Sequence, residues 1–144
     1  MVLIGLKAYK NYWEDNMQPQ TELMLNIRDD IDKNIIGIEV ALSELKDDGR
    51  VYAELGAGYV EKTYTRGSGL YVHPVLFICK GNDEPAIIEK LSMIANYYKS
   101  KRKPPKGQAY TAIGLQVAAE PGKIERQEDE QLLYSCAVNF KIIY

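Results

Sequence analysis

The sequence has few residues of the kinds that build disulfides, metal sites and histidine-based catalytic sites. Among its 144 residues there are two cysteines, Cys79 and Cys136, and one histidine, His73. Two cysteines so far apart form neither a disulfide framework nor a CxxC metal site, and one histidine excludes a multi-histidine metal site within a subunit. A Ser-His-Asp triad would have to use His73, whose neighbour Pro74 and strand context favour a structural or surface histidine over a catalytic one. We therefore expect no catalytic residue, no metal and no cofactor.

Long apolar runs and an excess of either charge are also missing. No apolar stretch approaches the roughly 18 residues of a membrane span. The apolar opening of the chain is followed by Lys7 and Lys10, which reverses the charge order of a signal peptide. The 18 Lys and Arg residues face 20 Asp and Glu, a net charge of −2, so the chain as a whole lacks the positive charge typical of duplex-binding proteins. We expect a folded protein with no membrane partner, made and kept inside a cell.

The composition that remains is that of one folded domain. Hydrophobic residues make up 46% and charged residues 26% of the chain, which disfavours disorder, collagen-like repeats and coiled coils. The length and the lack of a dividing linker indicate a single domain over residues 1–144. Tyrosine occurs 11 times, against 2 Phe and 1 Trp. Because tyrosine tolerates partial burial at interfaces, this excess hints at assembly.

Three stretches repeat apolar residues at intervals of three and four, the spacing of an amphipathic helix. The first occupies residues 3–13, and the second runs from a capping Thr21 to Ile35. The third is the clearest: residues 82–85 supply capping oxygens, negative charge and a proline allowed near a helix start, and its stripe continues through Ser100. We expect this third helix to pack its apolar stripe on a sheet.

Five stretches rich in β-branched and aromatic residues are predicted strands. They cover residues 38–42, 51–55, 59–65, 70–79 and 110–117. The second and third flank the glycines of residues 56–58, which indicates a hairpin or a glycine-kinked ribbon. In the fourth, Pro74 points to an edge or a bulge, whereas the unbroken apolar run of residues 75–78 is typical of a strand covered on both faces.

Near the end of the chain, apolar residues recur at every second position, as they do in a strand with one buried face. In the fifth predicted strand, Ile113, Leu115 and Val117 are expected on one side. In the closing segment every even position from Leu132 to Tyr144 is apolar or aromatic, which predicts a half-buried antiparallel strand. The order of helix, strands, helix and two strands predicts an α+β fold, in which a mostly antiparallel sheet packs against one or two amphipathic helices.

Two charged segments are the candidate contact surfaces. Residues 99–106 hold five basic side chains in a proline-stiffened loop that cannot continue the third helix. Residues 118–130 form an acidic connection without the oxygen spacing and central glycine of a calcium loop. Because opposite charges complement each other across interfaces, we expect these loops to contact neighbouring subunits or partners. The candidate residues are Lys101, Arg102, Lys103 and Lys106 in the basic segment and Glu125, Glu128, Asp129 and Glu130 in the acidic one.

The basic segment leaves a second function open. A run of this kind can track phosphates, so the alternative is a nucleic-acid-binding accessory protein that uses residues 99–106. The net charge of −2 and the lack of aromatic residues within the run argue against it. A third class, a small enzyme, would need a carboxylate-based site, and we locate none in the sequence.

The second half of the chain resembles a known family. It runs from LYVHPVLFI at residues 70–78 to a helix beginning at residues 84–91, then through the turn at residues 120–124 to LYSCAVNFKI at residues 133–142. This series resembles the minor capsid and tail-terminator proteins of long-tailed bacteriophages. The resemblance covers residues 70–144 and includes no residue of catalytic strength.

The resemblance implies a structural protein, not an enzyme, at the phage head-tail junction. It implies a ring, commonly a hexamer, that caps the growing tail tube and offers its other surface to the head connector. The implied partners are copies of the same chain, the tail tube protein and the head-tail connector protein, with DNA involved at most by passage through the ring. It also implies a virion protein assembled in the cytoplasm of a bacterial host, which agrees with reduced cysteines.

Overall fold

The computed structural model describes residues 17–45 and 49–144 of the chain. The helix expected at residues 3–13 lies outside the described residues. In chain order the described elements are α2 (Pro19–Asn34), β1 (Val40–Ala41), β2 (Val51–Leu55), β3 (Tyr59–Thr63), β4 (Gly69–Gly81), α3 (Glu84–Lys101), β5 (Thr111–Arg126) and β6 (Leu132–Ile143).

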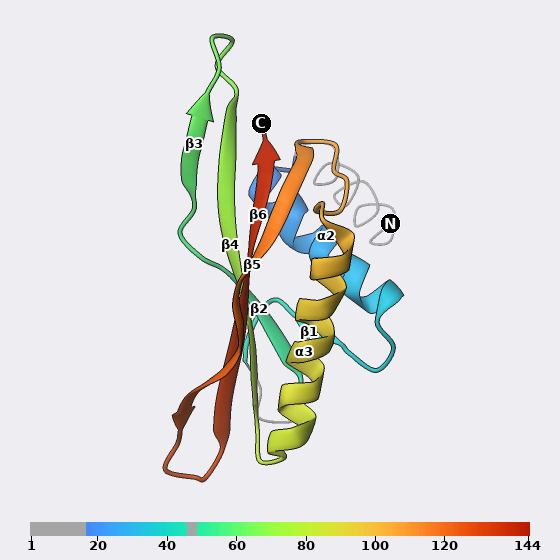
Figure 1. Ribbon diagram of the computed structural model, residues 1–144, viewed down its shortest axis with the longest axis vertical. Coiled ribbons are helices and arrows are strands. Elements are labelled where there is room, and N and C mark those ends of the chain that lie inside the picture. Colours follow the sequence, from blue (N-terminus) through green and yellow to red (C-terminus); the bar gives the residue numbers. More distant parts are fainter. Residues whose placement is uncertain (1–16, 46–48) are drawn as a thin grey trace, which may run out of the picture.

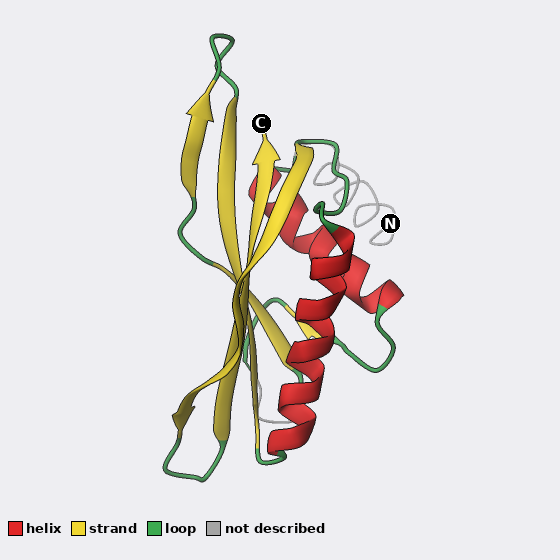
Figure 2. Cartoon of the chain, in the orientation of Figure 1, coloured by secondary structure: helices red, strands yellow, loops and turns green. Residues whose placement is uncertain are grey.

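The strands form one sheet, and both described helices lie on the same side of it. The strand order is β1-β2-β4-β6-β5, and β3 also pairs with β4. The pairing of β1 with β2 is parallel, and the others are antiparallel. Figures 1 and 2 show α2 and α3 against one side of the twisted sheet. The expected α+β fold, with a mostly antiparallel sheet packed against helices in one small domain, is confirmed.

The closing strand supplies the centre of the core. The even-numbered residues of β6 are buried from Leu132 to Ile142, and the odd-numbered ones are half-buried. Phe140 has no exposed surface and meets the ring of Tyr98 from α3 edge-on, with ring centroids 5.2 Å apart. Phe77 of β4 lies 6.3 Å from the same ring. The predicted closing strand and the predicted packing of the third helix on the sheet are therefore confirmed.

Local sequence explains where both helices begin. Asp83 caps α3, since its Oδ1 accepts a hydrogen bond of 3.3 Å from the amide of Ala86. Pro85 occupies the first turn, where a helix needs no amide hydrogen. Pro19 begins α2 for the same reason. The expected cap at Thr21 is wrong, because the proline starts the helix two residues earlier and leaves Thr21 inside it.

β2 and β3 lie end to end along one side of β4 and form the kinked ribbon rather than a hairpin. β2 pairs with residues 75–79 of β4, and β3 pairs with residues 69–72. Pro74 lies between these two pairings in an inner strand, so the expectation of an edge or a bulge there is wrong. Its carbonyl accepts from the amide of Gly56 at 2.7 Å. In a strand, the amide and the carbonyl of one residue point toward the same neighbouring strand. The nitrogen of Pro74 therefore points toward the gap between β2 and β3, where no hydrogen bond of the sheet is lost.

The inner strand β4 has one well-covered face. Val75, Phe77 and Cys79 are buried, whereas Leu76 and Ile78 point the other way and are half-buried. In Figures 1 and 2 the described helices lie only on the side of the core. The expectation of a strand covered on both faces is therefore wrong within the part of the chain that the structure describes.

The edge strand β5 is longer than the sequence predicts. It runs on to Arg126, so most of residues 118–130 are strand rather than loop. Pro121 is tolerated there because an edge strand has one side on which no ladder hydrogen bond is needed. The hairpin turn between β5 and β6 is consequently confined to residues 127–131.

A bulge changes which residues of β5 face the core. The register with β6 shifts between Ala112 and Gly114. The extra residue turns Ile113 outward, where 38% of it is exposed, and Ala112 instead packs on the core together with Leu115 and Val117. The prediction that Ile113 shares a side with Leu115 and Val117 is therefore wrong.

Candidate interaction surfaces

The basic segment begins inside α3, not after it. Lys99 and Lys101 lie in the last turn of the helix, and Arg102 ends it with a left-handed φ of 65°. Lys103 and Lys106 follow in the connection to β5, and all five basic side chains are exposed. The expectation of a loop from residue 99 onward is wrong for its first residues. The helix dipole favours cations at this end of a helix.

Contacts with α2 hold the backbone of the basic loop. Glu22 is buried, and its Oε1 accepts hydrogen bonds from the amides of Gln108 and Ala109, the second at 3.1 Å. Asn26 Nδ2 donates to the carbonyl of Lys106 at 3.0 Å. Lys103 and Lys106 therefore project from a loop that is fixed against α2, and the other three basic side chains project from the end of α3.

The acidic candidates occupy the β5–β6 hairpin. Glu125 lies on β5, while Glu128, Asp129 and Glu130 lie in the turn, and all four are exposed. The amide of Gln131 donates to Asp129 Oδ1 at 3.1 Å, and Glu130 adopts a left-handed φ of 64°. These carboxylates thus project from a hydrogen-bonded turn at the end of a two-stranded ribbon.

The eight candidate residues form two clusters that lie near the two ends of α3. Figure 1 shows the loop after α3 in the upper part of the molecule, below the tip of the β3–β4 hairpin, and the β5–β6 hairpin at the lower end of the long axis. Between them runs α3, whose 18 residues span about 27 Å. The segments do touch between the clusters, where Lys99 Nζ forms an ion pair with Glu120 Oε1. Within one subunit the structure does not bring the basic and acidic candidates together.

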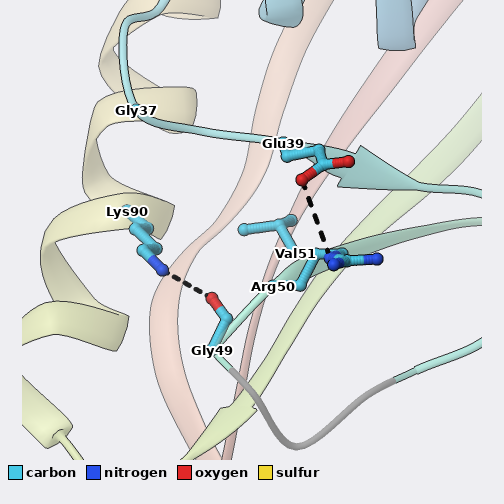
Figure 3. A pocket seen from close by; sticks show the side chains of 6 residues that line it. All are labelled: Gly37, Glu39, Gly49, Arg50, Val51 and Lys90. Carbon is cyan, nitrogen blue, oxygen red and sulfur yellow. Dashed lines mark hydrogen bonds and ion pairs between the residues drawn. The ribbon is translucent and has the colours of Figure 1, made fainter.

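A small polar pocket lies beside α3 (Figure 3). Its lining is Gly37, Glu39, Gly49, Arg50, Val51 and Lys90. Lys90 Nζ donates to the carbonyl of Gly49 at 2.6 Å, and Arg50 Nε lies 3.8 Å from Glu39 Oε2. The charged groups of the pocket are thus engaged with one another or with the backbone. In residues 17–45 and 49–144 no group of three His, Cys, Asp or Glu side chains gathers to hold a metal ion.

His73 is buried where β4 meets the end of the chain. Its Nε2 lies 2.9 Å from the hydroxyl of Tyr144, which also accepts a hydrogen bond of 3.0 Å from Gln20 Nε2. The ring of Tyr144 stacks on Tyr71 with centroids 4.1 Å apart. Nδ1 has no hydrogen-bond partner within the described chain, and burial lowers the pKa of His73.

Both cysteines are buried free thiols. Burial raises the pKa of the Cys136 thiol to about 12. Cys79 Sγ donates to the carbonyl of Gly49 at 3.3 Å. Because the thiolate is the reactive form of cysteine, the Cys136 thiol is unsuited to nucleophilic chemistry.

One surface that the sequence analysis missed is the open face of the sheet. Leu76 and Ile78 of β4 lie on it, and their strand partners place Tyr52 of β2 and Ala137 of β6 on the same face. The unbroken apolar run of residues 75–78 carried a signal of this surface, because it predicted a second covered face. Which strands would flank that run was not readable from it, since pairing joins distant segments of the chain.

None of the described helices is long and apolar enough to cross a membrane. Neither a protein-family model nor a curated protein matches this sequence.

Proposed function

We propose that this chain is a structural subunit of the phage head-tail junction, a tail terminator that forms a ring of about six copies around the end of the tail tube. The observation that carries the proposal is the fixed separation of opposite charges. Lys101, Arg102, Lys103 and Lys106 are exposed at the C-terminal end of α3 and in the loop after it, and the four acidic candidates are exposed in the β5–β6 hairpin near the other end of that helix. The resemblance of residues 70–144 to phage tail-terminator proteins supports the same assignment.

Unlike ends suit head-to-tail contacts between copies. A contact between two different surfaces of the same protein generates a ring when the rotation between neighbours closes. In such a ring the basic end of one copy meets the acidic hairpin of the next, and opposite charges set the orientation of the contact. Because hydrogen bonds from side chains already hold the backbone of both segments, little backbone freedom is lost when they meet.

The proposed role depends on position rather than turnover. A terminator has to match the end of the tube on one surface and refuse further tube subunits on the other. The ionisable groups described above support such a role. His73 bonds the hydroxyl of Tyr144, Cys136 has no exposed surface, and Lys90 bonds a backbone carbonyl.

Binding to isolated tails tests the proposal. Gold-labelled protein is mixed with tails from a phage mutant that lacks it, and the tails are imaged by negative-stain electron microscopy. The proposal predicts label at one end of each tail and none along the tube. Label along the whole tube, or at neither end, would overturn it.

The alternative, nucleic-acid binding, is favoured by one feature of the structure. Lys103 and Lys106 project from a loop fixed to α2, directly after the cations in the last turn of α3, and a fixed row of cations suits a row of phosphates. A mobility-shift titration with labelled single-stranded and duplex DNA at physiological salt separates the two functions. The terminator proposal predicts no shift, whereas a shift abolished by Lys101→Gln, Lys103→Gln and Lys106→Gln together would favour the alternative.

A further inference from the structure

Polar side chains stand at every fourth position of α2 and form one stripe along the helix. They are Glu22, Asn26 and Asp30. Residues four apart lie one above the other on a helix, so this polar stripe runs beside the apolar stripe of the core, which consists of Leu23, Ile27 and Ile31. Each member of the polar stripe bonds a group outside α2. The polar stripe is therefore a contact surface within the fold.

Before the basic segment (residues 99–106), the polar stripe holds the last turns of α3. The hydroxyls of Tyr97 and Tyr98 donate to the two carboxylate oxygens of Asp30, at 2.7 and 3.2 Å. Both tyrosines lie in α3, directly before the basic side chains of Lys99 and Lys101. The helix end from which these two cations project is thus tied to α2.

After the basic segment, the polar stripe holds the backbone of the loop. Asn26 Nδ2 donates to the carbonyl of Lys106 at 3.0 Å and to the hydroxyl of Tyr110 at 3.1 Å. Glu22 Oε1 accepts from the amides of residues 108 and 109. The basic segment is therefore fastened to one helix at both of its ends.

The close approach of the loop to α2 leaves no room for a side chain at Gly107. A Cβ there would overlap the carboxylate of Glu22 and the ring of Tyr110. Both neighbours are buried, and the hydroxyl of Tyr110 also donates to the carbonyl of Pro105 at 2.7 Å. Neither can move aside without losing hydrogen bonds. The loop reaches the polar stripe because residue 107 is glycine.

We propose that the polar stripe of α2 positions the basic segment for its partner, and that Glu22, Asn26 and Gly107 are positioning residues of that contact. The stripe fastens both ends of the segment, and its two carboxylates carry the charge opposite to the segment's five cations. A segment held in this way loses less conformational freedom on binding than a loose one. The inference rests on the proposed function, which names the acidic hairpin of the next copy as the partner.

Hydrogen exchange measures the holding itself, with no partner present. NMR gives the exchange rates of the amides of Gln108 and Ala109 in the full chain, relative to the unfolded chain, and these amides exchange only while their bonds to Glu22 are open. We expect Asn26→Ala to raise both rates about tenfold, the effect of one lost hydrogen bond on the opening equilibrium. Gly107→Ala should raise them at least as much, from the other side of the contact.

Two matched variants serve as controls. Asn34→Ala removes the same side chain at the end of α2, where its bonds stay within that helix. Gly122→Ala adds the same methyl group at a position where a Cβ has room. Neither should change the exchange of the two amides. Glu22→Gln keeps a side-chain oxygen for both amides and should also stay near the wild type, whereas Glu22→Ala should act like Asn26→Ala.

Complementation of a phage that lacks the protein measures the effect on the partner contact. Gly107→Ala should lower the yield of joined particles about tenfold or more, the effect of one displaced central contact. The assay is run well below the melting temperature of the variant, where a change in stability alone does not move the yield. Gly122→Ala should complement normally. If Gly107→Ala does not fold, Glu22→Ala combined with Asn26→Ala releases the loop without any overlap and provides the same readout.

Two results would overturn the inference. One is an Asn26→Ala variant whose amides at residues 108 and 109 exchange as slowly as in the wild type. The other is a Gly107→Ala variant that complements normally while the triple glutamine variant of the basic segment does not. If both of these variants complement normally, the proposed contact between copies fails, and the positioning role falls with it. The two proposals are thus told apart by the triple glutamine variant.

Discussion

Tyr98 shows why part of the tyrosine excess is structural. Its ring has no exposed surface and packs against Phe77 and Phe140, while its hydroxyl donates to Asp30 Oδ2 at 3.2 Å. The neighbouring Tyr97 donates to Asp30 Oδ1 at 2.7 Å. Burial, reinforced by the carboxylate, raises the pKa of both hydroxyls, so they remain donors that join α3 to α2. These tyrosines pack their rings within the fold and use their hydroxyls to join the two helices. A high tyrosine count therefore does not by itself identify an interface between subunits.

Phe140→Ala tests the packing at the centre of β6. The ring is fully buried against Tyr98, so its removal leaves a cavity and should lower the free energy of unfolding by about 3–5 kcal/mol. Urea unfolding followed by circular dichroism measures the loss. Ile113→Ala, at a position that is 38% exposed, is the control and should cost far less. A Phe140→Ala variant as stable as the wild type would contradict the burial of this ring.

His73 predicts a pH dependence of stability. Burial lowers its folded-state pKa below the ordinary value of 6.5, so below about pH 6.5 the unfolded chain binds more protons than the folded one. Stability should therefore be fully present above that pH and fall as the pH drops toward the folded pKa. Thermal melts between pH 5 and 8 measure how the melting temperature changes with pH, and His73→Gln should reduce this change near and below pH 6.5. His73 is the only histidine in the chain, so equal slopes in both proteins would show that its ring is solvated.

Among the helices and strands, the sequence predicted best those in which the spacing of apolar residues is regular along the whole element. α3 has both a capping Asp83 and a continuous apolar stripe, and β6 alternates along its whole length. β5 was predicted too short and with one wrong inward residue, because bulges change the register without leaving a mark in the period of the sequence. The start of α2 was misplaced because Pro19 outweighs a capping side chain at Thr21.

Charge reversal of the basic segment tests the proposed contact between subunits. A phage that lacks the protein is complemented with a variant carrying Lys101→Glu, Arg102→Glu and Lys103→Glu. We expect the yield of joined particles to fall about tenfold or more, because three contacts of up to about 1 kcal/mol each become repulsive. The melting temperature should stay close to that of the wild type, since these side chains are exposed.

The control for this variant carries the same change in net charge elsewhere. Lys33→Glu, Lys62→Glu and Arg66→Glu alter exposed residues outside the basic segment and should complement normally. Normal complementation by the basic-segment variant would place residues 101–103 outside the interface. Failure of both variants would point to net charge rather than to a particular surface.

At the scale of the whole molecule, the sequence predicted the candidate residues but not their arrangement. Composition identified the two charged segments, yet only the tertiary structure shows that the basic cluster lies at the C-terminal end of α3 and the acidic one in the hairpin near the N-terminal end of that helix. The open face was equally hidden, because it is assembled from β2, β4, β6 and β5 through strand pairing. Pairing depends on contacts between residues far apart in the chain, which local periodicity does not encode.

We propose that this chain fixes where a phage tail ends and joins the tail to the head. The most direct test of this proposal is the distribution of tail lengths, measured by electron microscopy, in a phage from which the gene for this chain has been deleted. A positional role without turnover predicts irregular, overlong tails and heads that remain unjoined, both restored when the protein is supplied from a plasmid. Tails of normal length joined to heads in the deletion mutant would show that this chain does not terminate the tail.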